Sequence, residues 1–78
     1  MLNVKILSPE KTLFSGEAES VKVPGEKGRF EILSGHAPII SSLIAGKVVC
    51  SGKENLELEI KGGFVDVKRD KVSICVEL

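Results

Sequence analysis

The chain has 78 residues, 42% of them hydrophobic, with 11 basic and 11 acidic side chains and therefore no net charge. This length allows one small domain, residues 1–78, with an accessible surface of roughly 4,600 Å². Most nucleic-acid-binding domains carry a basic excess, which is missing here. The apolar content argues against disorder, and no apolar run approaches the roughly 20 residues of a membrane span. Without a secretory leader, the sequence predicts a compact, soluble, intracellular module.

Apolar and polar residues alternate along most of the chain, which is the period of β-strands. Alternation is clearest at 2–6, 21–23, 56–60 and 72–76. Turn residues separate these runs at 8–11, 15–16, 24–28, 34–36, 51–55 and 68–71. Short runs with turns at such intervals are typical of sandwiches and barrels. We therefore predict an all-β fold, a small sandwich or flattened barrel of about ten short strands, without a C-terminal helical domain.

Several expected strands contain two adjacent apolar residues instead of a clean alternation. The pairs are Ile39-Ile40, Leu43-Ile44, Val48-Val49 and Phe64-Val65. Adjacent residues of a strand point to opposite faces of a sheet, so each pair places one apolar side chain on the outer face. Either the loops of a very small sandwich cover these outer side chains, or another protein does.

Residues suited to catalysis or metal binding are few and scattered. His36 is the single histidine, and no carboxylate or nucleophile is spaced around it as a catalytic triad requires. Cys50, His36 and Cys75 lack the spacing of metal ligands. We predict no catalytic, cofactor-binding or metal-binding residue. The two cysteines are expected to be half-buried free thiols, as in a reducing compartment.

Two glycine pairs and one lysine could serve as binding features. Gly25 and Gly28 do not match a phosphate-binding loop, and Gly62-Gly63 predicts a bend or bulge at a corner of the sandwich. Biotinyl and lipoyl carrier domains are also all-β and of similar length, and they present a modified lysine at a hairpin tip. Lys22 is a faint match, although its alternation places it inside a strand. A carrier domain modified on Lys22 remains the alternative function.

A more specific pattern covers nearly the whole chain. It includes the segments 4–10, 13–17, 21–25, 28–40 and 60–67, in which Gly35-His36-Ala37-Pro38 precedes an apolar run and Gly62-Gly63 follows later. In combination these segments resemble the epsilon subunit of bacterial F-type ATP synthases.

The resemblance implies a non-catalytic β-sandwich in the rotor of the synthase. In that family the domain binds the gamma shaft on one side and the polar loops of the membrane c-ring on the other, below the alpha/beta head. It is peripheral to the membrane, on the cytoplasmic face of the bacterial inner membrane. The implied gamma contacts are Ser8, His36, Ala37, Pro38, Ile39, Ile40, Ser41 and Leu43. The implied c-ring contacts are Glu26, Lys27, Gly28, Arg29, Phe30 and Glu31.

The sequence departs from the family at a few positions. Many relatives have an acidic residue in place of Arg29, a glycine in place of Glu31 and a proline in place of Ser34. We therefore expect the ring contact to depend on shape and several weak charge pairs. Most relatives continue into a pair of helices that can inhibit ATP hydrolysis, whereas this chain stops at Leu78. The expectation is a naturally short subunit that couples rotation without such inhibition.

Overall fold

The structure is a computed structural model that describes residues 1–53 and 55–78. In these residues the chain forms seven strands and no helix, which confirms the all-β prediction. The strands are β1 (Leu2–Leu7), β2 (Thr12–Ala18), β3 (Ser20–Gly25), β4 (Gly28–Leu33), β5 (Ile39–Ser51), β6 (Leu56–Lys68) and β7 (Lys71–Glu77).

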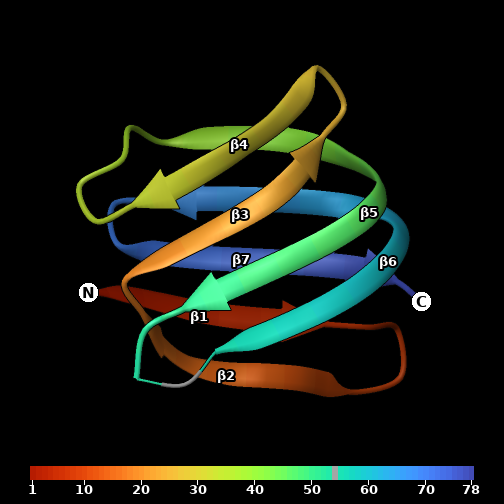
Figure 1. Cartoon of the computed structure of the whole chain (residues 1–78), viewed down its shortest axis with the longest axis horizontal. Coiled ribbons are helices and arrows are strands. Elements are labelled where there is room, and N and C mark those ends of the chain that lie inside the picture. The colour runs from red at the N-terminus through yellow and green to blue at the C-terminus, as the bar shows by residue number, and fades with distance from the viewer. Residues whose placement is uncertain (54) are drawn as a thin grey trace.

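The number of strands is seven and not about ten because two strands are long. β5 and β6 have 13 residues each and pair with one another from Ile39↔Val67 to Cys50↔Leu56. Both curve around the same edge of the molecule, so that one strand serves two layers (Figure 1). Each curved strand looks like two separate strands in the sequence, because its alternation is interrupted at the bend.

Glycines at the bend allow the set of inward-facing positions to shift by one residue along the strand. On β6 the buried residues are Ile60 before the bend and Val65 and Val67 after it, and the spacing from Ile60 to Val65 is odd, which an unbent strand does not give. Gly63 has φ of 152°, and a Cβ there would overlap the carbonyl oxygen of Cys75. Only glycine fits this position, so the predicted bend at Gly62-Gly63 is confirmed. On β5 a Cβ at Gly46 would lie 2.9 Å from Cβ of Pro24.

All seven strands form one sheet in the order β2-β1-β7-β6-β5-β3-β4, and this sheet folds back on itself. β1 and β7 are parallel, and the other neighbours are antiparallel. One layer contains β2, β1 and β7 with residues 63–68 of β6 and 39–44 of β5 (Figure 1). The other layer contains β3 and β4 with the remaining halves of β5 and β6. We call them the β7 layer and the β3 layer.

The core lies between the two layers and is entirely apolar. Its larger fully buried side chains include Leu2, Ile6, Ile32 and Ile74. Cys50 is also fully buried, more deeply than predicted, because it lies in the inward row of β5. Burial raises the pKa of the Cys50 thiol to about 11. Cys75 is half-buried, and both thiols are free.

Most predicted turns are present, but the one at Ser15-Gly16 is wrong. Both residues lie inside β2, where Gly16 pairs with Val4. A Cβ at Gly16 would come within 3.1 Å of the Phe14 ring, so the glycine leaves room for an aromatic side chain. The predicted hairpin loop at 51–55 does connect β5 to β6, although Glu54 lies outside the described residues.

Candidate functional site

The outer face of the β3 layer is charged. Across its strands Lys22 pairs with Glu31, and Lys47 pairs with Glu59. Opposite charges on directly facing residues stabilise a sheet in water. Lys22 also pairs with Val49 of β5 and therefore lies in the middle of a strand, as its alternation predicted. The tip of the β3–β4 hairpin is instead at Glu26 and Lys27.

The outer face of the β7 layer is apolar along β5 and β6. Ile40, Ile44 and Phe64 are 74%, 52% and 51% exposed. Phe64 pairs with Ser42, so both isoleucines are its diagonal neighbours, within reach of an aromatic ring. The adjacent Leu43 and Val65 are buried. The doubled apolar pairs therefore do place one side chain outside, and no loop covers these three.

This apolar surface continues across the neighbouring strands. Phe64 pairs with Cys75 of β7, and Cys75 pairs with Leu7 of β1, so the three side chains share one row of the outer face. Cys75 and Leu7 are half-buried. Beside them lies a hollow of about 350 Å³, lined by Leu7, Ser8, Pro9, Gly63, Phe64, Cys75, Val76 and Glu77. We call Leu7, Ile40, Ile44, Phe64 and Cys75 the apolar face.

Two carboxylates lie near the border of the apolar face, Glu77 in the lining of the hollow and Asp66 on the other side of Phe64. Asp66 is on β6, two residues after Phe64, and pairs with Ile40 on one side and Ser73 on the other. Its Oδ1 atom is buried and has no hydrogen-bond partner among the described residues. Asp66 is not among the contact residues expected from the sequence. The available signal was its even spacing from Phe64, which places both on the outer face.

The loop that carries His36 is tied to the distant turn between β6 and β7. Oδ1 of Asp70 accepts hydrogen bonds from the Gly35 N–H at 3.0 Å and from Oγ of Ser34 at 3.2 Å. Both hydrogen bonds lower the pKa of Asp70, and the bond from Gly35 has the larger effect. The His36 N–H donates to the Leu33 carbonyl at 3.0 Å, and its Nδ1 donates to the Ala37 carbonyl at 2.7 Å.

The candidate gamma contacts are divided between surface and interior. Ile40 belongs to the apolar face, and Ala37 and Pro38 are exposed in the loop before it. Ile39 and Ser41 are half-buried, and Leu43 is buried, because alternate residues of β5 point inward. Leu43 thus contributes its side chain to the core and not to a surface. Ser8 is half-buried, and its Oγ bonds both N and O of Lys11 at 3.2 Å.

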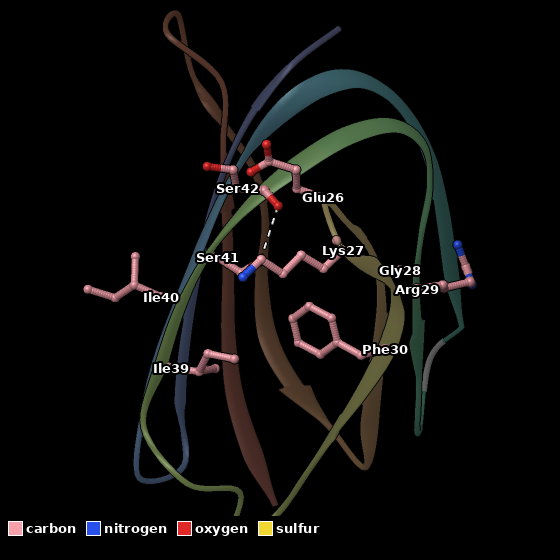
Figure 2. A pocket seen from close by; sticks show the side chains of 10 residues that line it. Glu26, Lys27, Gly28, Arg29, Phe30, Ile39, Ile40, Ser41 and Ser42 are labelled. Carbon is pink, nitrogen blue, oxygen red and sulfur yellow. Dashed lines mark hydrogen bonds between the residues drawn. The ribbon is translucent and has the colours of Figure 1, made fainter.

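The candidate ring contacts surround the open end of the sandwich. A hollow of about 600 Å³ there is lined by residues 25–30 and 39–42 (Figure 2). In Figure 2, Phe30 points into this space, whereas Ile40 points away from it. The Glu26 N–H donates to the Ser42 carbonyl at 2.9 Å. The expected ring and shaft contacts therefore adjoin here, because the end of β3 pairs with β5.

Arg29 braces the bend of β5 from outside. Its Nη1 donates to the Lys47 carbonyl at 2.8 Å. β3 lies between β4, which carries Arg29, and β5, which carries Lys47. The pairing register of β3 with β5 shifts between Lys22 and Gly25, so part of β5 has no partner on β3 there. Pro24 lies within this irregular segment, where its missing N–H is tolerated. Arg29 is exposed, as are Glu26, Lys27 and Glu31, but its guanidinium also has a hydrogen-bond partner within the chain.

The described residues contain neither a cluster of metal ligands nor a helical membrane span. No three of their histidine, cysteine, aspartate and glutamate side chains gather as a metal site would need. In the same part of the chain there is no helix long and apolar enough to cross a membrane.

Comparison with known proteins gives consistent matches. A family model described as "ATP synthase, Delta/Epsilon chain, beta-sandwich domain" matches residues 1–78. The ATP synthase epsilon chain of Leptospira borgpetersenii is 42% identical over 77 residues, which are 97% of this chain and 61% of the relative. That of Caulobacter vibrioides is 40% identical over 97% of this chain and 90% of the relative. The chain thus spans about three fifths of the first relative and most of the second.

Two solved assemblies contain a chain of the same fold. One is the Euglena gracilis mitochondrial ATP synthase OSCP/F1/c-ring, with a TM-score of 0.88 at 18% identity, covering 96% of this chain and 49% of that one. The other is the Tetrahymena thermophila mitochondrial ATP synthase central stalk and c-ring, with a TM-score of 0.83 at 16% identity, covering 99% and 63%. At these identities the likeness shows a shared fold.

Proposed function

The chain belongs to the family of ATP synthase delta/epsilon chain β-sandwich domains, and from this premise we propose that it is a non-catalytic rotor subunit of an F-type ATP synthase. In this role it links the gamma shaft to the membrane c-ring, so that ion-driven rotation of the ring is transmitted to the alpha/beta head. The observation that carries the proposal is the contiguous apolar face on the β7 layer, opposite a β3 layer whose outer face carries cross-strand charge pairs.

The apolar face is the proposed contact with the gamma shaft. Three large side chains exposed by half or more on neighbouring strands are unusual for a surface meant only for water. The candidate Ile40 lies on this face, and the candidate Ser8 lines the hollow beside it. Phe64 is the central side chain of the face, which makes it the proposed anchor of the interface, since aromatic anchors in desolvated centres dominate binding energy.

The tip of the β3–β4 hairpin is the proposed contact with the c-ring. Glu26, Lys27 and Glu31 are exposed and carry mixed charge, which suits the polar loops that the family contacts. The ring contact would rest on shape and several weak charge pairs. Because Arg29 is engaged with Lys47, we assign it to bracing the bend and not to a direct ring contact.

The size of the molecule is sufficient for two partners. A standard interface buries about 800 Å² of each partner. The accessible surface is 4910 Å², so two such interfaces would cover about a third of it. A sheet whose halves are joined by continuous strands is stiff, which a part that transmits torque requires.

The location follows from the partners. Bound to the shaft and the ring, the chain would be peripheral to the membrane, at the cytoplasmic face of a bacterial inner membrane. The family's inhibitory action resides in helices outside the sandwich, so for residues 1–78 we propose coupling alone.

Co-purification tests this function. The tagged chain is captured from detergent-solubilised membranes of its own source, and its partners are identified by mass spectrometry. We expect the gamma, alpha, beta and c subunits together. Capture without any synthase subunit would contradict the proposal, and a mass increment on Lys22 in that case would favour the carrier-domain alternative.

A further inference from the structure

We propose that Phe64 and Asp66 together form a site for an arginine side chain of the shaft partner, with the carboxylate of Asp66 as the hydrogen-bond acceptor. This inference rests on the proposed function and adds the chemistry by which the apolar face recognises its partner. It requires one feature of the partner surface, a guanidinium that can reach over an aromatic ring.

The first observation is the unsatisfied carboxylate oxygen. Oδ1 of Asp66 is buried without a hydrogen-bond partner among the described residues. Most buried side-chain polar atoms in native proteins have a hydrogen-bond partner, either protein or ordered water, and a buried acceptor without a donor is costly. Lys68 follows on the same strand and Lys71 begins the next, and neither ammonium donates to Oδ1. The missing donor is therefore best supplied from outside the chain.

The second observation is the position of the carboxylate. Asp66 is separated from Phe64 by one residue on the same strand, so both side chains rise from the same face of the β7 layer. Ile40, opposite Asp66, is 74% exposed and belongs to the apolar face. The enclosed oxygen is thus at the border of a docking surface and not in the core.

These two neighbours match the chemistry of arginine. A guanidinium stacks on aromatic faces and donates to a carboxylate through a planar pair of N–H groups. Phe64 supplies an exposed ring and Asp66 supplies the acceptor, side by side on the outer face. A lysine ammonium would balance the charge of Asp66. It has no planar group that could stack on the Phe64 ring while it donates to the carboxylate.

Asp66→Asn tests the proposal. The probe is the alpha/beta/gamma complex purified from the same source without this subunit, and the affinity of the chain for it is measured by calorimetry. We expect the affinity to fall by about 10- to 100-fold, because the amide keeps one acceptor oxygen but lacks the negative charge that would pair with the guanidinium at a desolvated interface. The control is Glu59→Gln, a carboxylate-to-amide change on the same strand that lies on the charged face; its affinity should stay within about twofold of wild type.

The thermal stability of the isolated variant separates recognition from a structural role. If Asp66 lacks an internal donor, the Asp66→Asn chain melts at or above the wild-type temperature. A fall of more than about 4 °C would reveal an internal partner and overturn the proposal. So would an unchanged affinity for the complex. If wild-type chain itself did not bind the complex, the proposed function would fail first, which is a distinguishable result.

Discussion

The carboxylate of Asp70 accepts a hydrogen bond from the backbone N–H of Gly35 at 3.0 Å, which joins the loop carrying His36 to the β6–β7 turn. Ser34 adds a second bond to the same oxygen at 3.2 Å. The loop leads directly into β5 and hence into Ile40 of the apolar face. The position of this end of the proposed shaft contact is therefore set by a turn remote in the sequence.

This tether should depend on pH. Its bonds lower the pKa of Asp70 below the ordinary value of 3.8, so the tether is present above that value and is lost as the pH falls through the lower folded pKa. We expect the amide resonance of Gly35 to titrate with a midpoint below 3.8. In Asp70→Asn this titration should vanish. The Gly52 amide, which donates to Asn55 at 3.3 Å, is the non-titrating control; a Gly35 midpoint at or above 3.8 would argue against the tether.

Gly63→Ala should destabilise the sandwich strongly. The new Cβ would overlap the Cys75 carbonyl and adopt a backbone conformation with φ of 152° that alanine disfavours. We expect a loss of about 3 kcal/mol in the free energy of unfolding, measured with urea. Gly28→Ala is the matched control, since its φ is 132° but nothing lies within 4 Å, and it should lose about 1 kcal/mol. Equal losses would show that crowding at the bend contributes nothing.

Phe64→Ser should weaken association with the synthase more than it affects folding. The ring is 51% exposed at the centre of the apolar face, so its removal takes little from the core. We expect at least about a tenfold loss of affinity for the alpha/beta/gamma complex, as for an interface anchor. Leu33→Ser removes a side chain of 50% exposure from β4, in the other layer, and should bind as wild type. If the leucine variant lost as much affinity, the shaft contact would have been placed on the wrong layer.

Arg29→Met should reduce stability even in the absence of any partner. The bond from its guanidinium to the Lys47 carbonyl spans the irregular part of β5, and its loss should cost about 1 kcal/mol in urea unfolding. Lys27→Met, at the exposed hairpin tip, removes a charge without such a bond and should stay within about 0.5 kcal/mol. Unchanged stability of Arg29→Met would return Arg29 to the candidate ring contacts.

The two thiols should react at very different rates. Burial raises the pKa of Cys50 to about 11, so almost no thiolate is present at pH 8, and the sulfur is enclosed. Iodoacetamide should therefore label only half-buried Cys75 in the folded chain, and both thiols in urea, as peptide mass spectrometry can determine. Because the folded pKa of Cys50 is raised, stability should fall as the pH rises from 9.0 toward 11. Labelling of native Cys50 would contradict its position in the core.

The fold could be predicted because alternation reports which side of a strand is buried. The inward residues of β1, β3 and β7 are those that alternation assigned, including Val4, Val21 and Ile74. The number of strands could not be predicted, because the one-residue shift at Gly62-Gly63 looks like a break between strands although the chain continues through it. The turn predicted at Gly16 was wrong for a related reason. In a sequence, a glycine that makes room for Phe14 cannot be distinguished from a glycine that turns the chain.

The candidate site was predictable only in part, for reasons of geometry. A contiguous run such as Ile39–Leu43 suggests one surface. Consecutive residues of a strand point to opposite faces, however, so Ile40 lies outside and Leu43 lies in the core. The doubled pair Phe64-Val65 predicted one outward side chain but not which of the two, and Phe64 was not among the expected shaft contacts. Leu7 and Cys75 join it only through the pairing of β1, β7 and β6, a relationship between distant segments that alternation alone does not contain.

The parallel pairing of β1 with β7 has a consequence for how the chain reaches this structure. Asn3 pairs with Lys71, so β1 meets its parallel neighbour β7 only after all the residues between them have been made. Until then β1 and β2 form a hairpin separated from the rest of the sheet. Such distant contacts make folding slow, on the order of milliseconds to seconds. We expect the sandwich to close only once β7 has been made, with Phe64 and its apolar neighbours on β6 lacking their β7 neighbour until then.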